Sequence, residues 1–152
     1  MGIEKQQIRR VREEDLPALV RLCRDHAAYE ASEFHENGQA VRLRTAFFGS
    51  RPVLHGWVVE GAEGLNGFMT ATIDFATWPA EFFLHMDCLY LSEPFRGKGL
   101  GKQLMDRLRE FAQENKINLI QWQTPSQNDL GIKFYERLGA HSKDKKRYFL
   151  DV

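Results

Sequence analysis

Apolar residues recur at helical spacing in four segments of this chain. The first helix is predicted to begin after Asp15, an N-cap residue type, and to end near Tyr29. Its apolar stripe consists of Leu16, Leu19, Val20, Cys23 and Ala27. The last helix is predicted to end at Gly139, because glycine commonly follows a helix C-terminus. The other predicted helices cover residues 41–48, 99–115 and 129–138.

Extended apolar runs between these helices predict strands. The turn sequence Gly-Ala-Glu-Gly at 61–64 joins two such runs and indicates a hairpin. The resulting order, β-α-α-β-β-β-α-β-α-β, predicts a mixed α/β (α+β) fold with a mixed, mostly antiparallel central sheet flanked by helices. The predicted strands cover residues 8–11, 53–60, 65–75, 82–91, 118–124 and 147–151.

Length and charge narrow the function classes. The 152 residues suit one domain, and 21 basic against 21 acidic residues give a formal net charge of +0. This balance exerts no global attraction for nucleic acid or an anionic membrane. Arg9, Arg10 and Arg12 are followed directly by three acidic residues, which further disfavours a nucleic-acid-binding module.

Cysteine usage and the start of the chain point to a cytoplasmic protein. Cys23 and Cys88 have apolar neighbours and are interpreted as reduced core thiols. No Cys/His ligand spacing predicts a metal site. Residues 1–10 lack an apolar signal region, and no apolar run approaches the roughly 18 residues of a membrane span.

Residues 89–101 carry the strongest chemical signal. They run from a strand through a turn into a loop with glycine at 97, 99 and 101, followed by an amphipathic helix. Free backbone N–H groups and a helix N-terminus form a phosphate site, to which Arg96 and Lys98 add charge. The spacing fits neither a Walker A loop nor GxGxxG. The alternative is a helix N-terminus with flexible glycines and two solvated cations.

Arg96 to Gly101 resembles the acetyl-CoA pyrophosphate loop of the GNAT superfamily of N-acetyltransferases. Asn128 and the segment Phe-Tyr-Glu-Arg-Leu-Gly-Ala at 134–140 are similar to a second signature of that family, at the expected spacing. The order of elements from residue 8 to 150 also matches. Residues 28–30 and 76–91 look most like diamine and polyamine acetyltransferases. Where those enzymes carry a Glu-Asp pair, this chain has Met86 and Asp87.

The resemblance implies that acetyl-CoA is the co-substrate. It implies a backbone N–H near Leu89 that polarises the thioester carbonyl, with Tyr90 and Leu91 pairing with the extended pantetheine arm. Asn128 would contact the cofactor, or serve only as a helix cap. The cofactor-binding residues implied by the family are Leu89, Tyr90, Leu91, Arg96, Gly97, Lys98, Gly99, Leu100, Gly101, Lys102, Asn128 and Tyr135.

Transfer to an amine requires a base and an acid. A lysine-like amine has a pKa near 10.4, so its deprotonation at pH 7 costs roughly 4–5 kcal/mol. Tyr135 is the candidate acid for the departing thiolate, unless it only packs. His85 and Asp87 are the candidate bases, because residues two apart on a strand share a face. A structural histidine, and an aspartate that binds the cationic amine, are the alternatives.

Acidic and aromatic residues predict a small polycationic acceptor, either polyamine-like or an aminoglycoside. The alternative is a solvated acidic loop in a neutral protein. Two other functions stay open, an acetyltransferase for protein N-termini or lysines and a non-catalytic acyl-CoA sensor. By resemblance alone the chain is also expected to form a homodimer. The candidate acceptor-binding residues are Glu30, Glu33, Asp74, Trp78, Glu81 and Asp87.

Overall fold

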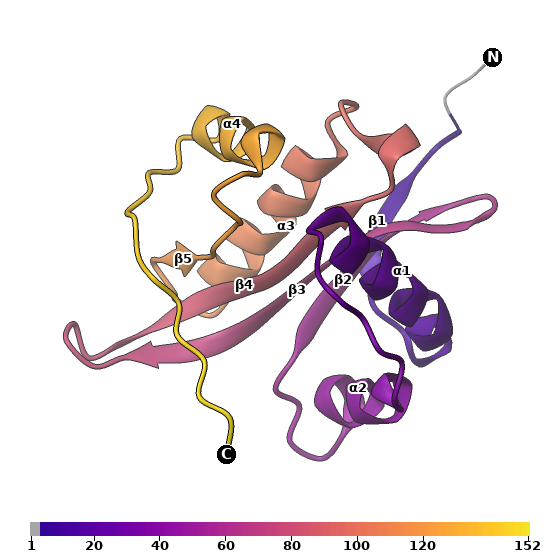
Figure 1. The fold of residues 1–152 in the computed structure, drawn as a ribbon. Coiled ribbons are helices and arrows are strands. Elements are labelled where there is room, and N and C mark those ends of the chain that lie inside the picture. Colours follow the sequence, from indigo (N-terminus) through magenta and orange to yellow (C-terminus); the bar gives the residue numbers. More distant parts are fainter. Residues whose placement is uncertain (1–3) are drawn as a thin grey trace.

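The computed structural model describes residues 4–152 and confirms the mixed α/β prediction (Figure 1). Every predicted helix is present, with bounds that differ by at most two residues. The elements are, in chain order, β1 (Gln7–Arg10), the short 3-10 helix η1 (Glu13–Asp15), α1 (Leu16–Tyr29), α2 (Gln39–Phe48), β2 (His55–Gly61), β3 (Gly64–Ala76), β4 (Glu81–Leu91), the 3-10 helix η2 (Glu93–Phe95), α3 (Leu100–Glu114), β5 (Ile120–Gln121) and α4 (Asp129–Arg137).

The strands form one sheet in sequence order. The first four strands pair antiparallel, so the predicted hairpin of β2 and β3 is confirmed. β5 pairs parallel to β4, and only through Leu84 with Ile120 and His85 with Gln121. The last strand therefore covers a small part of the β4 edge.

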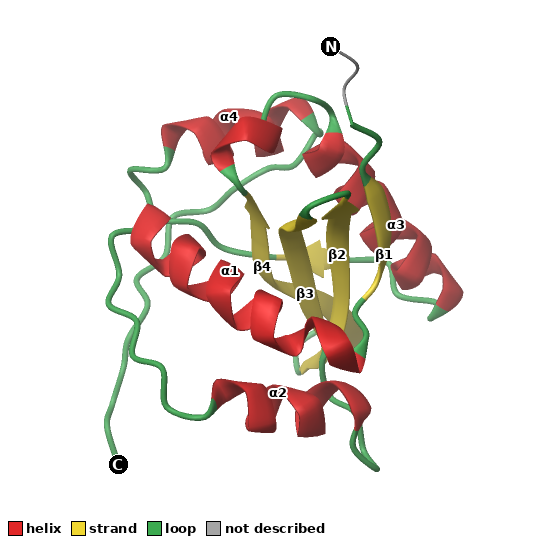
Figure 2. Cartoon of the chain, turned by 90° about the vertical axis from the view of Figure 1, so that its right-hand side faces the viewer, coloured by secondary structure: helices red, strands yellow, loops and turns green. Residues whose placement is uncertain are grey.

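Helices cover both faces of this sheet (Figure 2). α1 and α2 lie on one face, where Leu16 and Leu19 pack with Phe68 in a buried cluster. α3 lies on the other, where Leu104 and Leu108 belong to a second buried cluster, with α4 packed against its margin. Alternate strand residues supply the two clusters, as expected for a sheet buried on both sides.

The predicted strand over 147–151 is wrong, since the described chain has no regular structure after α4. Tyr148, Phe149 and Leu150 are 85%, 78% and 89% exposed. The predicted strand over 118–124 shrinks to the two residues of β5. Both differences have one cause, because an extended segment becomes a strand only where a neighbour accepts its backbone hydrogen bonds.

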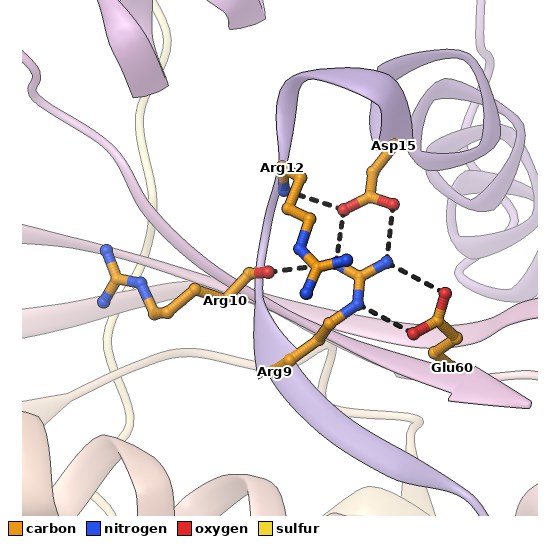
Figure 3. Close-up of polar contacts among 5 residues, drawn as sticks. All are labelled: Arg9, Arg10, Arg12, Asp15 and Glu60. Carbon is orange, nitrogen blue, oxygen red and sulfur yellow. Dashed lines mark hydrogen bonds and ion pairs between the residues drawn. The ribbon is translucent and has the colours of Figure 1, made fainter.

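Asp15 occupies the predicted N-cap position of α1, but its side chain makes no capping hydrogen bond to that helix. It lies in η1, where its carboxylate accepts two hydrogen bonds from Arg9, at 2.7 and 2.9 Å, and one from the Arg12 backbone N–H. Arg9 also donates to Glu60 on β2, at 2.8 and 3.1 Å (Figure 3). The Arg9 and Asp15 side chains are only 10% and 6% exposed. This network ties β1 to β2 and to the start of α1.

Candidate functional site

A β-bulge interrupts β4 at Asp87. Thr70 of β3 pairs with Cys88, whereas the next β3 residue, Ala71, pairs with Met86. Asp87 therefore has no partner across the ladder, and two residues of β4 oppose one of β3. An extra residue of this kind bends a strand and re-aims its side chains.

The bulge resets the alternation of β4. Met86 and Leu89, three residues apart, both belong to the cluster under α3, while Cys88 packs toward α1. His85 and Asp87 lie close together, with 3.9 Å between Nε2 and Oδ1. The predicted proximity of these two side chains is therefore found, on the α1 side of the sheet.

Beyond the bulge, no strand of the described residues 4–152 pairs with the edge of β4 that faces away from β3. The Ser92 N–H donates to the Asn66 carbonyl of β3. Because alternate residues of an antiparallel ladder direct their backbone groups to the same side, Tyr90 faces β3, while Leu89 and Leu91 face the open edge. We call the β4 edge over residues 86–91 the open edge.

Arg96 braces this edge. Its Nε donates to the Leu91 carbonyl at 2.8 Å, and its guanidinium carbon lies 4.5 Å from the ring centroid of Tyr29 and 5.5 Å from that of Tyr90. The side chain is thus turned toward the strand and α1. Arg96 was expected to supply charge to a phosphate. Its Nε is engaged by Leu91, so only its terminal N–H groups are left for such a contact.

Free backbone donors gather where α3 begins. Gly97 and Gly99 have φ of +73° and +81°, and nothing lies within 4 Å of a Cβ built on either. The first backbone hydrogen bond of the helix runs from Gln103 to the Gly99 carbonyl, at 3.1 Å. Within the described chain, no acceptor is bonded to the N–H groups of residues 97–102. Unbonded N–H groups at a helix N-terminus have the geometry and the dipole that suit an anion.

The two lysines beside this loop lie in different surroundings. The Lys102 ammonium pairs with Asp106 at 2.8 Å, one helical turn away, and the Lys98 Nζ lies 5.8 Å from the Phe95 ring centroid. The Lys102 ammonium is therefore engaged within α3, whereas that of Lys98 forms no ion pair within residues 4–152.

Asn128 connects three segments around the open edge. Its Oδ1 accepts from the Gly131 N–H, which confirms it as the cap of α4, and also from the Tyr29 hydroxyl at 3.0 Å. Its Nδ2 donates to Thr124 Oγ1 at 2.8 Å. The Tyr29 contact could not be predicted, since no sequence pattern relates residues 99 positions apart.

Tyr135 lies on α4 in an aromatic environment. Its ring centroid is 5.1 Å from that of Trp122 and 5.4 Å from that of Phe134. Burial, with smaller contributions from Glu30 and Tyr29, raises the pKa of Tyr135 to about 12. Its hydroxyl has no hydrogen-bond partner on the described residues, so it is a neutral donor available to a ligand.

His26, for which the sequence predicts no role, lies beside β4. Its ring stacks on Tyr90 with centroids 5.3 Å apart, and its Nε2 lies 3.2 Å from Glu30 Oε1. The i,i+4 spacing of His26 and Glu30 on a helix is the only sequence signal for this pair.

The predicted acceptor-binding residues do not form one cluster. Glu33 is exposed beside His35, and Asp74 accepts a hydrogen bond from the Thr72 hydroxyl. Trp78 and Glu81 line a cavity at the far end of the β3–β4 hairpin. Within residues 4–152, no three His, Cys, Asp or Glu side chains are placed to hold a metal ion, and no helix has the length and apolarity to span a membrane.

Known N-acetyltransferases are similar to this chain in sequence. A thialysine N-epsilon-acetyltransferase from Caenorhabditis elegans is 27% identical over 130 residues, covering 78% of this chain and 79% of that protein. A human spermidine/spermine N(1)-acetyltransferase-like protein is 24% identical over 141 residues, covering 88% of this chain and 20% of that protein.

A solved structure shares the whole fold. It is a predicted acetyltransferase with acetyl-CoA from Clostridium acetobutylicum, 18% identical, with a TM-score of 0.80 and 96% of each chain covered. The model of the acetyltransferase (GNAT) family matches residues 10–140. This match includes the glycine loop, the open edge, and the segment of Asn128 and residues 134–140. This chain therefore belongs to the GNAT family of N-acetyltransferases.

Proposed function

We propose that this protein transfers the acetyl group of acetyl-CoA directly to the primary amine of a small cationic molecule. The GNAT family uses acetyl-CoA, and the free N–H groups of residues 97–102 carry the proposal for this chain. They suit a diphosphate, since oriented N–H groups and a helix N-terminus bind that anion without a lysine contact. The open edge beside them suits the pantetheine amides.

Leu89 and Leu91 direct backbone groups to this edge, and the Leu91 carbonyl is already engaged by Arg96. The Leu89 N–H is the proposed donor to the thioester carbonyl, two residues beyond the bulge at Asp87. A backbone donor in a site that excludes water stabilises the oxyanion of the transition state. Tyr90 directs its backbone to β3, so only its side chain would line the site.

The reaction balances with one proton acceptor and one donor. The amine nitrogen loses a proton and forms the N–C bond to the acetyl carbon, the C–S bond breaks, and the CoA thiolate gains a proton. Tyr135 is the proposed donor, because its raised pKa of about 12 keeps the phenol protonated before transfer. His85 and Asp87, 3.9 Å apart at the bulge, are the proposed acceptor pair.

The names of relatives support a small amine as the acceptor, since one is a thialysine and another a spermidine/spermine-type acetyltransferase. Acidic side chains near the site, Glu30 and Asp87 among them, suit a cationic amine. The proposed acceptor is a polyamine-like molecule or an aminoglycoside. Acetylation of a peptide would need a longer groove.

Calorimetric titration with CoA tests the loop. Gly99→Asp adds a carboxylate among the donors and is expected to abolish CoA binding. Gly139→Asp is the matched control, because Gly139 also has positive φ, +89°, and open space around it but lies at the end of α4. Equal CoA affinity of the two variants would refute the proposed loop.

A panel of polyamines, aminoglycosides and peptides, read by release of free thiol, tests catalysis. Turnover with a small amine and none with peptides is the expected result. A protein that binds CoA but acetylates no amine would be the acyl-CoA sensor instead. In a sensor, Tyr135→Phe would leave CoA binding and the partner response unchanged.

We also propose that the protein forms a homodimer. The exposed apolar residues at 148–150 and the short β5 beside an uncovered sheet edge support it. Light scattering after gel filtration tests this, with Phe149→Asp expected to favour the monomer. A monomeric wild type would exclude the dimer. A cytoplasmic location stays a prediction.

A further inference from the structure

The strands β4 and β5 part at a tryptophan. Their pairing ends where His85 meets Gln121, so Met86 and Trp122 are the first residues beyond it. After Trp122 the chain leaves β4 and runs to α4 (Figure 1). It is tied there through Thr124, whose Oγ1 accepts a hydrogen bond from the cap of α4 at 2.8 Å. The two segments therefore diverge from a closed end at Met86 and Trp122, and the open edge begins at that end.

The Trp122 side chain lies on the α3 side of the sheet and is half-buried. It packs against the buried cluster that contains Met86, and Leu89 and Tyr135 pack against the same cluster. The centroids of the Trp122 and Tyr135 rings are 5.1 Å apart. Trp122 therefore lies beside the residue that is the proposed proton donor to the sulfur of CoA.

The position of Tyr135 is fixed relative to the glycine loop. A Cβ built on Gly101 would lie 3.0 Å from Phe134 Cζ, so the Phe134 ring packs directly on the first turn of α3. The rings of Phe134 and Tyr135 have centroids 5.4 Å apart. The start of α3, Tyr135 and Trp122 thus form one packed series.

The direction of the carrier follows from the proposed function. With its phosphates at residues 97–102 and its pantetheine arm along Leu91 and Leu89, the carrier runs toward Met86. Leu89 and Met86 are about 10 Å apart along the strand, at about 3.3 Å per residue. The acyl group of a thioester held at Leu89 therefore points toward the closed end, and each added carbon extends it by at most about 1.5 Å.

We propose that Trp122 restricts the acyl group to two carbons, because its indole ring fills the closed end of the site beyond the thioester. This inference rests on the proposed acetyl transfer and adds the residue that selects the acyl donor. An acetyl methyl would reach the indole, whereas a butyryl group would add two methylenes to space that is already filled. Packed side chains accommodate added methylenes poorly, and Trp122 is held by both Tyr135 and the buried cluster.

Calorimetric titration with acetyl-CoA and with butyryl-CoA tests this wall without an acceptor amine. We expect the wild type to bind butyryl-CoA at least about tenfold more weakly than acetyl-CoA, since one methylene in an apolar pocket changes discrimination by about ten- to two-hundredfold. Trp122→Ala should bring the two affinities within about threefold of each other. The ratio of kcat/KM for the two thioesters, measured with an amine that the panel identifies, should change in the same direction.

Trp78→Ala is the matched control, because it removes an indole that is 100% exposed at the far end of the β3–β4 hairpin. It should leave the ratio of the two affinities unchanged. Trp122→Phe keeps an aromatic ring beside Tyr135 and should give an intermediate ratio, so it replaces the alanine variant if that variant does not fold.

Three results would overturn the inference: equal affinity of the wild type for the two thioesters, a wild-type ratio in the folded Trp122 variant, or equal changes in the Trp122 and Trp78 variants. Each of them would leave acetyl transfer standing. A protein that binds acetyl-CoA but acetylates no amine would instead overturn the proposed function.

Discussion

The Tyr29 hydroxyl donates to Asn128 Oδ1 at 3.0 Å and so joins the last residue of α1 to the cap of α4. The Tyr29 ring also lies 6.3 Å from that of Tyr90 on β4. The hydrogen bond therefore runs beside the open edge, between the two helices that border it. An exposed hydrogen bond contributes little to global stability, but this one sets the spacing of two helices around the proposed cofactor.

Tyr29→Phe should weaken CoA binding more than folding. Removing the hydroxyl leaves the ring over Arg96 in place but breaks the link between α1 and Asn128, so we expect Kd for CoA to rise about three- to tenfold. The free energy of unfolding should fall by less than about 1 kcal/mol. Calorimetry and chemical denaturation measure the two effects. Tyr148→Phe, on the exposed C-terminal segment, should change neither, and an unaltered Kd in Tyr29→Phe would contradict the role given to this contact.

Tyr135→Phe should separate chemistry from binding. The ring and its contacts with Trp122 and Phe134 remain, while the proton donor is lost, so kcat should fall about a hundredfold or more. CoA affinity should stay within about twofold of wild type. Stopped assays of acetyl transfer and CoA titration measure these quantities. A kcat close to wild type would assign Tyr135 a packing role only.

The base assignment predicts a change in pH dependence. If His85 and Asp87 accept the proton from the amine, the acidic limb of the kcat/KM profile depends on them. His85→Gln and Asp87→Asn should each displace that limb and lower the plateau. His35→Gln is the control, because His35 is an exposed loop histidine beside Glu33. If the acidic limbs of the kcat/KM profiles coincide in the wild type and in all three variants, neither His85 nor Asp87 is the base.

The buried network around Arg9 predicts a stability effect that depends on pH. Burial alone would raise the pKa of Asp15, but hydrogen bonds from Arg9 and from the Arg12 N–H outweigh it and hold that pKa below its ordinary value. A depressed carboxyl pKa stabilises the fold above the unfolded value, and this contribution is lost as the pH falls below about 4.

Asp15→Asn should accordingly lower the free energy of unfolding by about 2–3 kcal/mol at pH 7, because Arg9 keeps only Glu60 as a charged partner. The difference from wild type should narrow toward pH 3. Urea denaturation across this pH range measures it. Glu13→Gln removes an exposed pair with Arg44 and should cost less than about 0.5 kcal/mol. A constant difference at every pH would contradict the assignment.

Both cysteine thiols should react slowly in the native protein. Burial, with Asp87 adding to it, raises the pKa of Cys23 to about 11 and that of Cys88 to about 12. Only a trace of reactive thiolate is then present at neutral pH, so an aromatic disulfide reagent should react at least about tenfold faster after unfolding. Ser50→Cys, on an exposed turn, is the control and should react at once.

The features that could be predicted from the sequence depend on residues that lie close together along the chain. The helices follow from apolar spacing within each segment, and the glycine loop follows from Gly97 and Gly99, whose conformations need no distant contact. The cap at Asn128 depends only on Gly131, three residues away. The residues that resemble the GNAT family, 96–101, Asn128 and 134–140, also lie in short segments of this kind.

Tertiary structure alone decided how these parts meet. The extra residue at Asp87 exists only in the register between β3 and β4, and the Tyr29–Asn128 contact joins residues from different layers. The cavity containing Glu81 and Lys145 arises where the C-terminal segment crosses the hairpin. Backbone propensity acts over a few residues, whereas register, edge exposure and charge proximity depend on which distant segments pack together. For that reason the sequence by itself determined the helices and the glycine loop, and the folded chain determined the bulge, the open edge and the contacts between the helices that border it.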